Sequence, residues 1–162
     1  MRKQACCFTG HRVIPAEELE TLTQKTEDIV RRLAKEGFVF FIAGGALGFD
    51  TLAAETVLRL RETEFPDIYL LLAIPCENQA AAWPPTERAR YERIRSEADK
   101  TRVLAEHYYN GCMQVRNRYM VDHASLCVCY MAKPTGGTAS TVRYAKKEKL
   151  TVINLAENGT EI

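Results

Sequence analysis

Two glycine pairs in this chain each follow a run of apolar, β-prone residues. Gly44-Gly45 follows residues 38–43, and Gly136-Gly137 follows residues 125–131 after a short polar stretch. A glycine pair at the end of a strand lets a ligand approach bare backbone, and the helix that comes next directs unpaired N–H groups and its positive dipole end at the same place. The pattern therefore favours binding of an anion, above all a phosphate.

The second pair is the richer of the two because hydroxyl side chains surround it. Thr135, Thr138 and Ser140 all lie close to these glycines in sequence. Backbone N–H groups and hydroxyl donors together make a phosphate cradle. The alternative is that Thr138 or Ser140 only caps the following helix, which would need a single hydroxyl.

The first pair is followed by Gly48 and Asp50. The three glycines suit a tight turn, but their spacing is not the dinucleotide-binding G-x-G-x-x-G, and the Gly-Lys-Ser/Thr of a Walker A loop is absent. A purely structural turn is the alternative to phosphate binding here. Asp50 is placed either to cap the next helix or to accept a hydrogen bond from a ribose hydroxyl.

A third loop with side chains suited to ligand binding or catalysis follows the first apolar run. It reads Thr9-Gly10-His11-Arg12. Arg12 suits bidentate binding of a phosphate, and His11 suits hydrogen bonding or acid/base chemistry. An ordinary pair of surface side chains is the alternative.

Two further segments carry polar or aromatic groups. Arg116 and Arg118 are two positions apart on an expected helix, so at most one of them points into a shared site, and Asn117 would add a hydrogen bond. Trp83, the single tryptophan, lies in an expected loop, where its face would either stack on a base or anchor local packing.

The elements that position these loops alternate along the chain. Apolar runs predict strands over 5–9, 38–43, 68–74, 101–105, 125–131 and 151–155, and helical periodicity or composition predicts helices over 15–37, 49–62, 86–99, 113–123 and 139–149. This alternation predicts an α/β fold: a Rossmann-like three-layer sandwich, mostly parallel, with helices on both faces and ligands bound beyond the carboxyl ends of the strands. We expect a single domain over residues 1–156 and a tail over 157–162.

Composition narrows the class of protein. The 162 residues include 22 Lys+Arg and 21 Asp+Glu, a net charge of +1, which gives no general electrostatic attraction to nucleic acid or to an anionic membrane. Six cysteines occur without any C-x-x-C spacing, so neither a zinc ribbon nor another metal site is expected. The first apolar run is too short for a signal sequence, and we expect a reduced, cytoplasmic protein.

Four loops in this order resemble the YpsA branch of the SLOG superfamily: residues 8–12, 44–50, 116–122 and 136–138. That superfamily unites the lonely-guy phosphoribohydrolases, the molybdenum-cofactor carrier proteins and the DNA-processing protein A family. The resemblance implies a Rossmann-like fold and a nucleotide or nucleotide-derived ligand, such as ADP-ribose or an NAD-related molecule, held between the two glycine turns. It also implies a homodimer, because relatives commonly pair through helices beside the site.

The chain departs from the catalytic relatives in one loop. The phosphoribohydrolases carry P-G-G-x-G-T-x-x-E, whereas Ala139 and Ser140 stand here at the second Gly-Thr, and Val142 and Arg143 stand where the acidic residue would be. Cleavage of an N-glycosidic bond passes through an oxocarbenium-like state that a carboxylate stabilises. Hydrolysis of that kind is therefore not expected unless a carboxylate comes from elsewhere, with Asp50, Glu55 and Glu77 as candidates.

We accordingly expect a binding or sensing module for a nucleotide-like small molecule, with no cofactor assigned. The alternative is a hydrolase or transferase with His11, Asp50 or Glu77 in acid/base roles and with Arg12 and Thr138 holding phosphate. Binding of single-stranded DNA is a third option, disfavoured by the near-neutral charge. The expected ligand-binding residues are Thr9, Gly10, His11, Arg12, Gly44, Gly45, Gly48, Asp50, Arg116, Asn117, Gly136, Gly137, Thr138 and Ser140.

Overall fold

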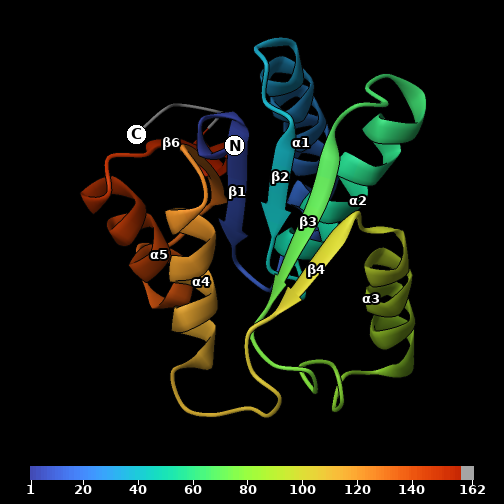
Figure 1. Ribbon diagram of the computed structural model, residues 1–162, viewed down its shortest axis with the longest axis vertical. Helices are drawn as coiled ribbons and strands as arrows, with labels where there is room; N and C mark the ends of the chain where they lie inside the picture. Colours follow the sequence, from blue (N-terminus) through green and yellow to red (C-terminus); the bar gives the residue numbers. More distant parts are fainter. Residues whose placement is uncertain (158–162) are drawn as a thin grey trace.

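A six-stranded sheet runs through the computed structural model, which describes residues 1–157 (Figure 1). Its strands are β1 (Ala5–Gly10), β2 (Phe40–Ala43), β3 (Tyr69–Ile74), β4 (Lys100–Val103), β5 (Leu126–Tyr130) and β6 (Thr151–Asn154). All neighbouring strands are parallel, in the order β4-β3-β2-β1-β5-β6. The chain builds outward from β1 to β4 and then returns to the other side of β1, so the topological switch lies between β1 and β5.

Helices cover both faces of this sheet (Figure 1). They are α1 (Ala16–Lys35), α2 (Phe49–Thr63), α3 (Pro85–Glu97), α4 (Cys112–Asp122) and α5 (Gly136–Lys147), and short 3-10 helices occupy Arg2–Gln4 (η1) and Leu155–Glu157 (η2). Helices α1, α2 and α3 contribute to one hydrophobic core, and α4 and α5 contribute to a second. The predicted α/β, Rossmann-like three-layer fold is confirmed.

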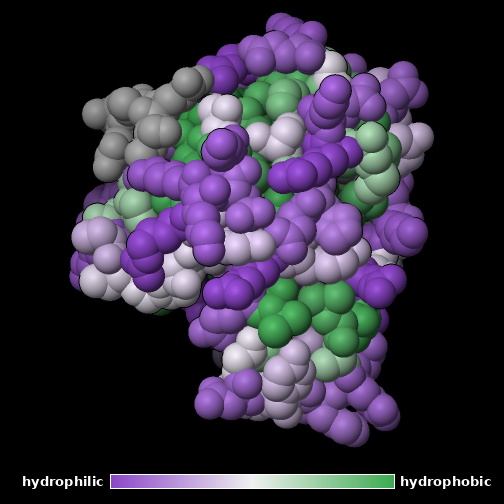
Figure 2. Space-filling view, turned by 60° about the vertical axis from the view of Figure 1, so that its left-hand side comes forward, coloured by the Kyte–Doolittle hydropathy of each residue, from purple (hydrophilic) through white to green (hydrophobic). Residues whose placement is uncertain are grey.

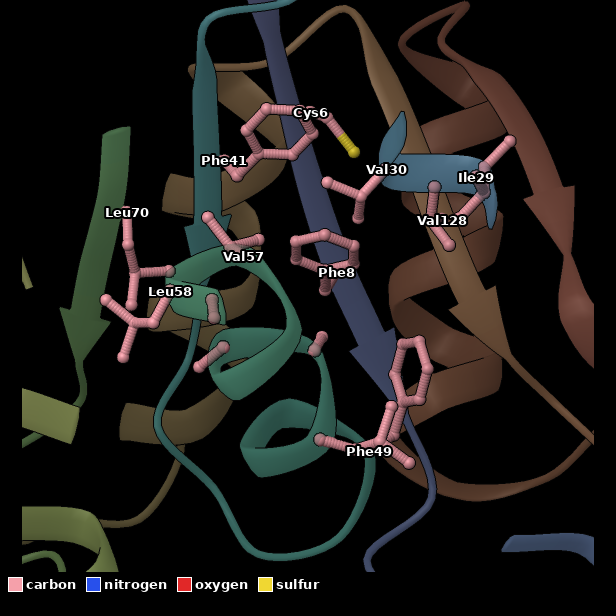
Figure 3. Close-up of a cluster of buried hydrophobic side chains, with 14 of the residues drawn as sticks. Cys6, Phe8, Ile29, Val30, Phe41, Phe49, Val57, Leu58, Leu70 and Val128 are labelled. Atoms are coloured by element: carbon pink, nitrogen blue, oxygen red, sulfur yellow. The ribbon is translucent and has the colours of Figure 1, made fainter. Parts of the chain in front are cut away.

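Strand β1 shows why the two cores lie on opposite faces. Cys6 and Phe8 belong to the core under α1 and α2, whereas Ala5 and Cys7 belong to the core under α4 and α5. Figure 3 shows Phe8 in the middle of the first core, and its ring stacks on that of Phe41 at a centroid distance of 6.2 Å. A strand buried on both faces needs apolar residues at every position, which is why the strands appear as continuous hydrophobic runs in the sequence.

The boundaries of most elements agree with the sequence prediction to within a few residues, but α5 differs in a way that matters. It begins at Gly136, so the second glycine pair forms the first turn of the helix and is not a loop that precedes it. Thr135 occupies the N-cap position, and its side chain makes no capping hydrogen bond. The alternative in which Thr138 or Ser140 caps this helix is therefore wrong.

The six cysteines are all free and buried, as small apolar side chains would be. Within residues 1–157 no helix combines the length and the apolar character needed to cross a membrane. One face of the molecule is mostly hydrophilic, with hydrophobic residues gathered in separate areas (Figure 2). Apart from its first residue, the tail that we expected over 157–162 lies outside the described residues.

Candidate functional site

A cavity of about 310 Å³ lies where the loops after β1 and β5 meet, which is the switch point of the sheet. Four segments supply its lining: the end of β1 and the loop after it, the turn before α2 with the first turn of that helix, the inner face of α4, and the start of α5. The lining residues are Thr9, Gly10, His11, Arg12, Ala46, Asp50, Met113, Arg116, Asn117, Thr135, Gly136, Gly137 and Thr138.

The start of α5 is open to this cavity. A Cβ atom built on Gly136 or Gly137 would meet no atom within 4 Å apart from the adjacent residues and the nearby backbone of the same helix. The first N–H groups of a helix have no partner within the helix, and the side chain of Thr135 does not cap them. Thr138 lies in the same turn and is buried against the cavity, and its hydroxyl makes no hydrogen bond to any residue in 1–157. Backbone donors, a hydroxyl and the positive end of a helix dipole thus face one space.

Arg116 forms the floor between α4 and the sheet. Its side chain reaches the backbone of β3 and of the turn after β2, where one guanidinium nitrogen donates to the carbonyl oxygen of Gly44 and lies 3.5 Å from that of Ala73. The residue is only 4% exposed, and this burial lowers the pKa of its guanidinium, while the negative charge of Asp50 opposes the shift. Its Nε donates to Oδ1 of Asn117 at 2.8 Å, which leaves the amide NH₂ of Asn117 as a donor for a ligand.

Asp50 lies in the first turn of α2 and is 5% exposed. Its Oδ2 accepts a hydrogen bond from the backbone N–H of Ala46 at 3.2 Å, so the carboxylate braces the turn before α2. Burial raises the pKa of Asp50, and the charges of Arg116 and Arg12 oppose that rise. The carboxylate is therefore an internal counter-charge for Arg116 as well as part of the cavity wall.

The first glycine pair does not open onto the cavity. A Cβ atom on Gly44 would lie 2.6 Å from a guanidinium nitrogen of Arg116 and 2.8 Å from Oδ2 of Asp50. A Cβ atom on Gly45 would meet Ile74 at 2.7 Å. The space beside these glycines is thus filled by the protein's own side chains, and the structure does not bring Gly44 or Gly45 into the cavity as we expected.

Gly48 and Gly10 also serve close packing. A Cβ atom on Gly48 would collide with the backbone carbonyl groups of His11 and Arg12, and one on Gly10 would lie 2.6 Å from Phe49. The backbone N–H of Phe49 donates to the carbonyl of His11 at 3.1 Å. These two glycines let the loop after β1 lie directly against the start of α2, and of the two only Gly10 lines the cavity.

His11 joins the two halves of the cavity wall. Its Nε2 lies 2.9 Å from the backbone N–H nitrogen of Ala132 and 3.2 Å from that of Lys133, so Nε2 accepts these bonds and the proton of the neutral ring resides on Nδ1. Partial burial lowers the pKa of His11, and the positive charge of Lys133 lowers it further. The ring therefore holds the loop after β5 against the loop after β1.

Arg12 presents the cavity's exposed cation. Its side chain makes no hydrogen bond or ion pair with any other residue in the described part of the chain, and it lies within electrostatic range of Asp50 and Arg116. An arginine in this state keeps all its donors available for an anion.

Several candidates lie away from the cavity. Glu77 makes an ion pair with Arg95 at 2.8 Å, and Glu55 makes one with Arg90 at 2.6 Å. Ser140 is exposed on α5 and is not part of the lining.

Two aromatic contacts explain other residues that the sequence singled out. Trp83 packs edge-on against Tyr91, with ring centroids 5.3 Å apart, which makes it a packing anchor in this structure. Arg118 lies over the ring of Tyr144 at 5.1 Å and points away from Arg116, as their spacing predicts.

Two lining residues, Ala46 and Met113, were not predicted from the sequence. Thr135 also lines the cavity; the sequence showed it as one of the hydroxyls beside the second glycine pair, but it was not among the expected ligand-binding residues. Met113 lies one helical turn before Arg116, and its sulfur is 3.7 Å from a guanidinium nitrogen of that residue. In residues 1–157 no group of three or more His, Cys, Asp or Glu side chains is placed to hold a metal ion.

Comparison with known proteins matches this architecture. The family model YpsA, described as the YspA SLOG family, matches residues 10–156. The uncharacterized SPbeta prophage-derived protein YoqJ of Bacillus subtilis is 32% identical over 130 residues, covering 73% of this chain and 75% of that protein. A UPF0398 protein of Halalkalibacterium halodurans is 31% identical over 126 residues, covering 76% of this chain and 66% of that protein.

Among solved structures, DNA processing protein A from Helicobacter pylori, described for its single-stranded DNA binding mode, superposes with a TM-score of 0.61. It is 23% identical, and the match covers 91% of this chain and 63% of that one. At this level of identity the likeness concerns the fold alone.

Proposed function

Because this chain belongs to the YpsA family of SLOG proteins, we propose that it binds a nucleotide-derived ligand through a phosphate at the start of α5 and serves as a sensing or regulatory module. The observation that carries the proposal is the open first turn of α5. The space beside the Cβ positions of Gly136 and Gly137 is open, and Thr135 at the N-cap makes no side-chain capping hydrogen bond. A phosphate group supplies the negative charge and the acceptor oxygens that such a helix start binds.

The neighbouring side chains fit the same ligand. Arg12 has unpaired donors, the hydroxyl of Thr138 has no hydrogen-bond partner in residues 1–157, and the amide of Asn117 keeps its NH₂ free of Arg116. A phosphate bound among them would be held by backbone donors, a hydroxyl and a guanidinium, and a ribose would lie toward Asn117 and Asp50. This is a polar recognition set around a phosphate.

Binding is favoured over catalysis because two of the three acid/base candidates, His11 and Glu77, are already engaged. Nε2 of His11 accepts two backbone N–H bonds, and Glu77 is paired with Arg95 outside the cavity. The position of the phosphoribohydrolase carboxylate holds Val142 or Arg143 instead. A group that already accepts hydrogen bonds at its basic atom is not free to abstract a proton there.

Calorimetric titration with ADP-ribose, NAD, AMP and cyclic nucleotides tests the proposal. The informative variant is Gly137→Glu, which places a negative charge inside the phosphate position. Its matched control is Ser140→Glu, which adds the same charge to the same helix outside the cavity. We expect Gly137→Glu to weaken binding by at least about a hundredfold and Ser140→Glu to change it less than about threefold. Absence of binding by every compound, or equal losses in both variants, would contradict the proposal.

A hydrolase or transferase activity is the second candidate, and one observation favours it. Asp50 is a buried carboxylate that lines the cavity and has a raised pKa, a combination that is enriched at catalytic sites. Incubation of the same compounds with the protein, followed by chromatography, tests this activity. Product formation that Asp50→Asn abolishes while the fold is retained would support catalysis.

The same preparation can test binding of single-stranded DNA, the disfavoured third option, and pairing of two copies, which the family resemblance implies. The net charge of +1 gives the chain little general attraction for a polyanion. A labelled single-stranded oligonucleotide, titrated at two salt concentrations, measures DNA binding. Light scattering after size exclusion measures the oligomeric state.

A further inference from the structure

A second cavity, of about 410 Å³, adjoins the candidate site on the side of α1 and α2. The turn before α2 divides the two: Ala46 lines the site, whereas Leu47 and Gly48 line the second cavity. Arg12 lines both. The two spaces therefore share one wall, and a single exposed guanidinium lies at their boundary.

The charges around the second cavity single out Arg12. Two further arginines line it, but Arg59 is paired with Glu27 at 3.2 Å and Arg90 with Glu55 at 2.6 Å. Arg12 has no such partner among residues 1–157. The unpaired cation thus stands between the two cavities, where it would contact an anionic group that passes from one to the other.

The second cavity has an aliphatic part. Its walls include the side chains of Ile14, Leu19, Leu47 and Leu52, together with polar groups such as Thr23, Glu55 and Glu87. Aliphatic walls with a few hydrogen-bonding groups suit a flat heteroaromatic ring, which presents apolar faces and polar edges. What distinguishes the candidate site is the open start of α5 together with the hydroxyl of Thr138, which suit a phosphate.

Size gives an independent argument. The site cavity, at about 310 Å³, is at the small end of the range of roughly 300–1,000 Å³ that ligand pockets occupy. A ligand of two linked halves needs more space than the small end of that range offers. The adjoining cavity supplies that space across the shared arginine.

We propose that the ligand is bipartite: one phosphate binds at the start of α5, a second phosphate linked to it binds Arg12, and the nucleoside end occupies the cavity between α1 and α2. The ligand class is then the diphosphate-linked nucleotides, not the mononucleotides. This inference rests on the proposed phosphate site at α5, and it assigns the second cavity to the same ligand.

A cavity-filling variant tests the assignment. Thr23 lies on α1, lines the second cavity and bonds only to the carbonyl of Leu19 in its own helix, at 2.7 Å. Thr23→Trp would fill the space, and Thr21→Trp, on the exposed side of the same helix, is the matched control. ADP-ribose is the two-part probe, and AMP is the single-phosphate probe.

For the wild type we expect ADP-ribose to bind at least about tenfold more tightly than AMP. Thr23→Trp should weaken ADP-ribose by about tenfold or more and leave AMP within about twofold, whereas Thr21→Trp should change neither. Arg12→Gln should also weaken ADP-ribose more than AMP, because the second phosphate loses its cation.

Each other result overturns the inference. If Thr23→Trp binds ADP-ribose as Thr21→Trp does, the second cavity is not part of the site. If it weakens AMP and ADP-ribose equally, the ligand does not divide between the cavities. If only AMP binds the wild type, the phosphate site stands and the bipartite ligand fails. If neither probe nor any other compound of the panel binds, the phosphate site itself is wrong, and the inference falls with it.

Discussion

The two glycine pairs share one sequence signature but have opposite surroundings. Beside Gly44 the space is occupied by the guanidinium of Arg116 and the carboxylate of Asp50, whereas beside Gly136 and Gly137 a Cβ atom would meet nothing. Both pairs follow the carboxyl end of a parallel strand; the first precedes α2, and the second forms the first turn of α5. The first pair therefore binds an internal cation through its carbonyl, and the second leaves its N–H groups for an external anion.

The difference shows that a glycine pair in the sequence indicates that some group packs closely against the backbone there. It does not indicate whether that group is a side chain of the protein or a ligand. At Gly44 the approaching group belongs to a residue 72 positions later in the chain. That contact fixes the floor of the cavity and brings Asn117 to its wall. The first glycine pair thus helps to form the structure of the site, and the second is available to bind a ligand.

Among the variants that test this contrast between the two glycine pairs, we expect removal of Arg116 to have the largest effect on stability. Arg116→Met leaves the carboxylate of Asp50 buried without its neighbouring cation, and we expect a loss of about 3–5 kcal/mol in the free energy of unfolding. Urea denaturation measures this loss. The double variant Arg116→Met/Asp50→Asn should recover part of it. Arg118→Met is the control, since that guanidinium only covers Tyr144, and it should cost less than about 1 kcal/mol. Equal effects of the two arginine variants would contradict the internal role of Arg116.

Alanine substitutions in the two glycine pairs test the same contrast between filled and open space. Gly44→Ala forces a methyl group against Arg116 and should destabilise the fold by about 1–3 kcal/mol. Gly137→Ala enters open space in a helix and should change stability by less than about 1 kcal/mol, in either direction. Thermal unfolding of the two variants side by side makes the measurement. A larger loss of stability for Gly137→Ala than for Gly44→Ala would show that the fold needs glycine at position 137, which would contradict the contrast.

Lowering the pH should weaken the hydrogen bonds that hold the loop before α5, which carries the second glycine pair. The turn at Gly44 should not be affected. The folded protein lowers the pKa of His11 below its ordinary value near 6.5, so the unfolded chain takes up the proton first. The contribution of His11 to stability is therefore complete above about pH 6.5 and is lost as the pH falls through the lower pKa of the folded state. Protonation removes the acceptor of the N–H groups of Ala132 and Lys133, an effect of about 1 kcal/mol.

Hydrogen exchange checks this expectation, with the exchange rates corrected for the intrinsic effect of pH. Protection at Ala132 and Lys133 should fall as the pH drops below about 6.5. Protection at Leu52 should stay constant, because its N–H donates to the backbone carbonyl of Gly48, which does not titrate. Replacing His11 with Gln should remove the pH dependence. Persistence of the pH dependence in that variant would assign it to another group.

The smallest effect is expected at Glu77, which lies outside both turns. Glu77→Gln breaks the exposed ion pair with Arg95 and should cost less than about 1 kcal/mol. Binding of ADP-ribose should be unchanged, since Glu77 does not line the cavity. A large loss of binding or turnover in this variant would restore Glu77 as a catalytic candidate.

The sequence predicted the parts of this fold that depend on local pattern. Continuous apolar runs identified the strands, since a strand covered on both faces has no polar side. The loops at Gly10, Asp50 and Gly136 were recognisable because turns and helix starts have local chemical requirements. These three loops do meet at one cavity.

What could not be predicted depends on contacts between distant residues. Nothing near Gly44 in the sequence shows that Arg116 fills the space beside it, and nothing near His11 shows that its ring accepts two N–H bonds from the loop after β5. The exclusion of Glu77 follows from its pairing with Arg95, which only the packing of α3 reveals. The shared wall between the two cavities is likewise a property of the assembled helices.

The return of the chain from β4 to β5 has a consequence for how the protein acquires its site. Strands β1 to β4 form one side of the sheet, and α4, β5 and α5, which come later in the chain, form the other side. Arg116 can reach Gly44 only when these two parts have docked. A chain in which docking is incomplete has neither the floor nor the facing wall of the cavity, so ligand binding at this place reports completed folding, and a ligand present during refolding would stabilise only the last state to form.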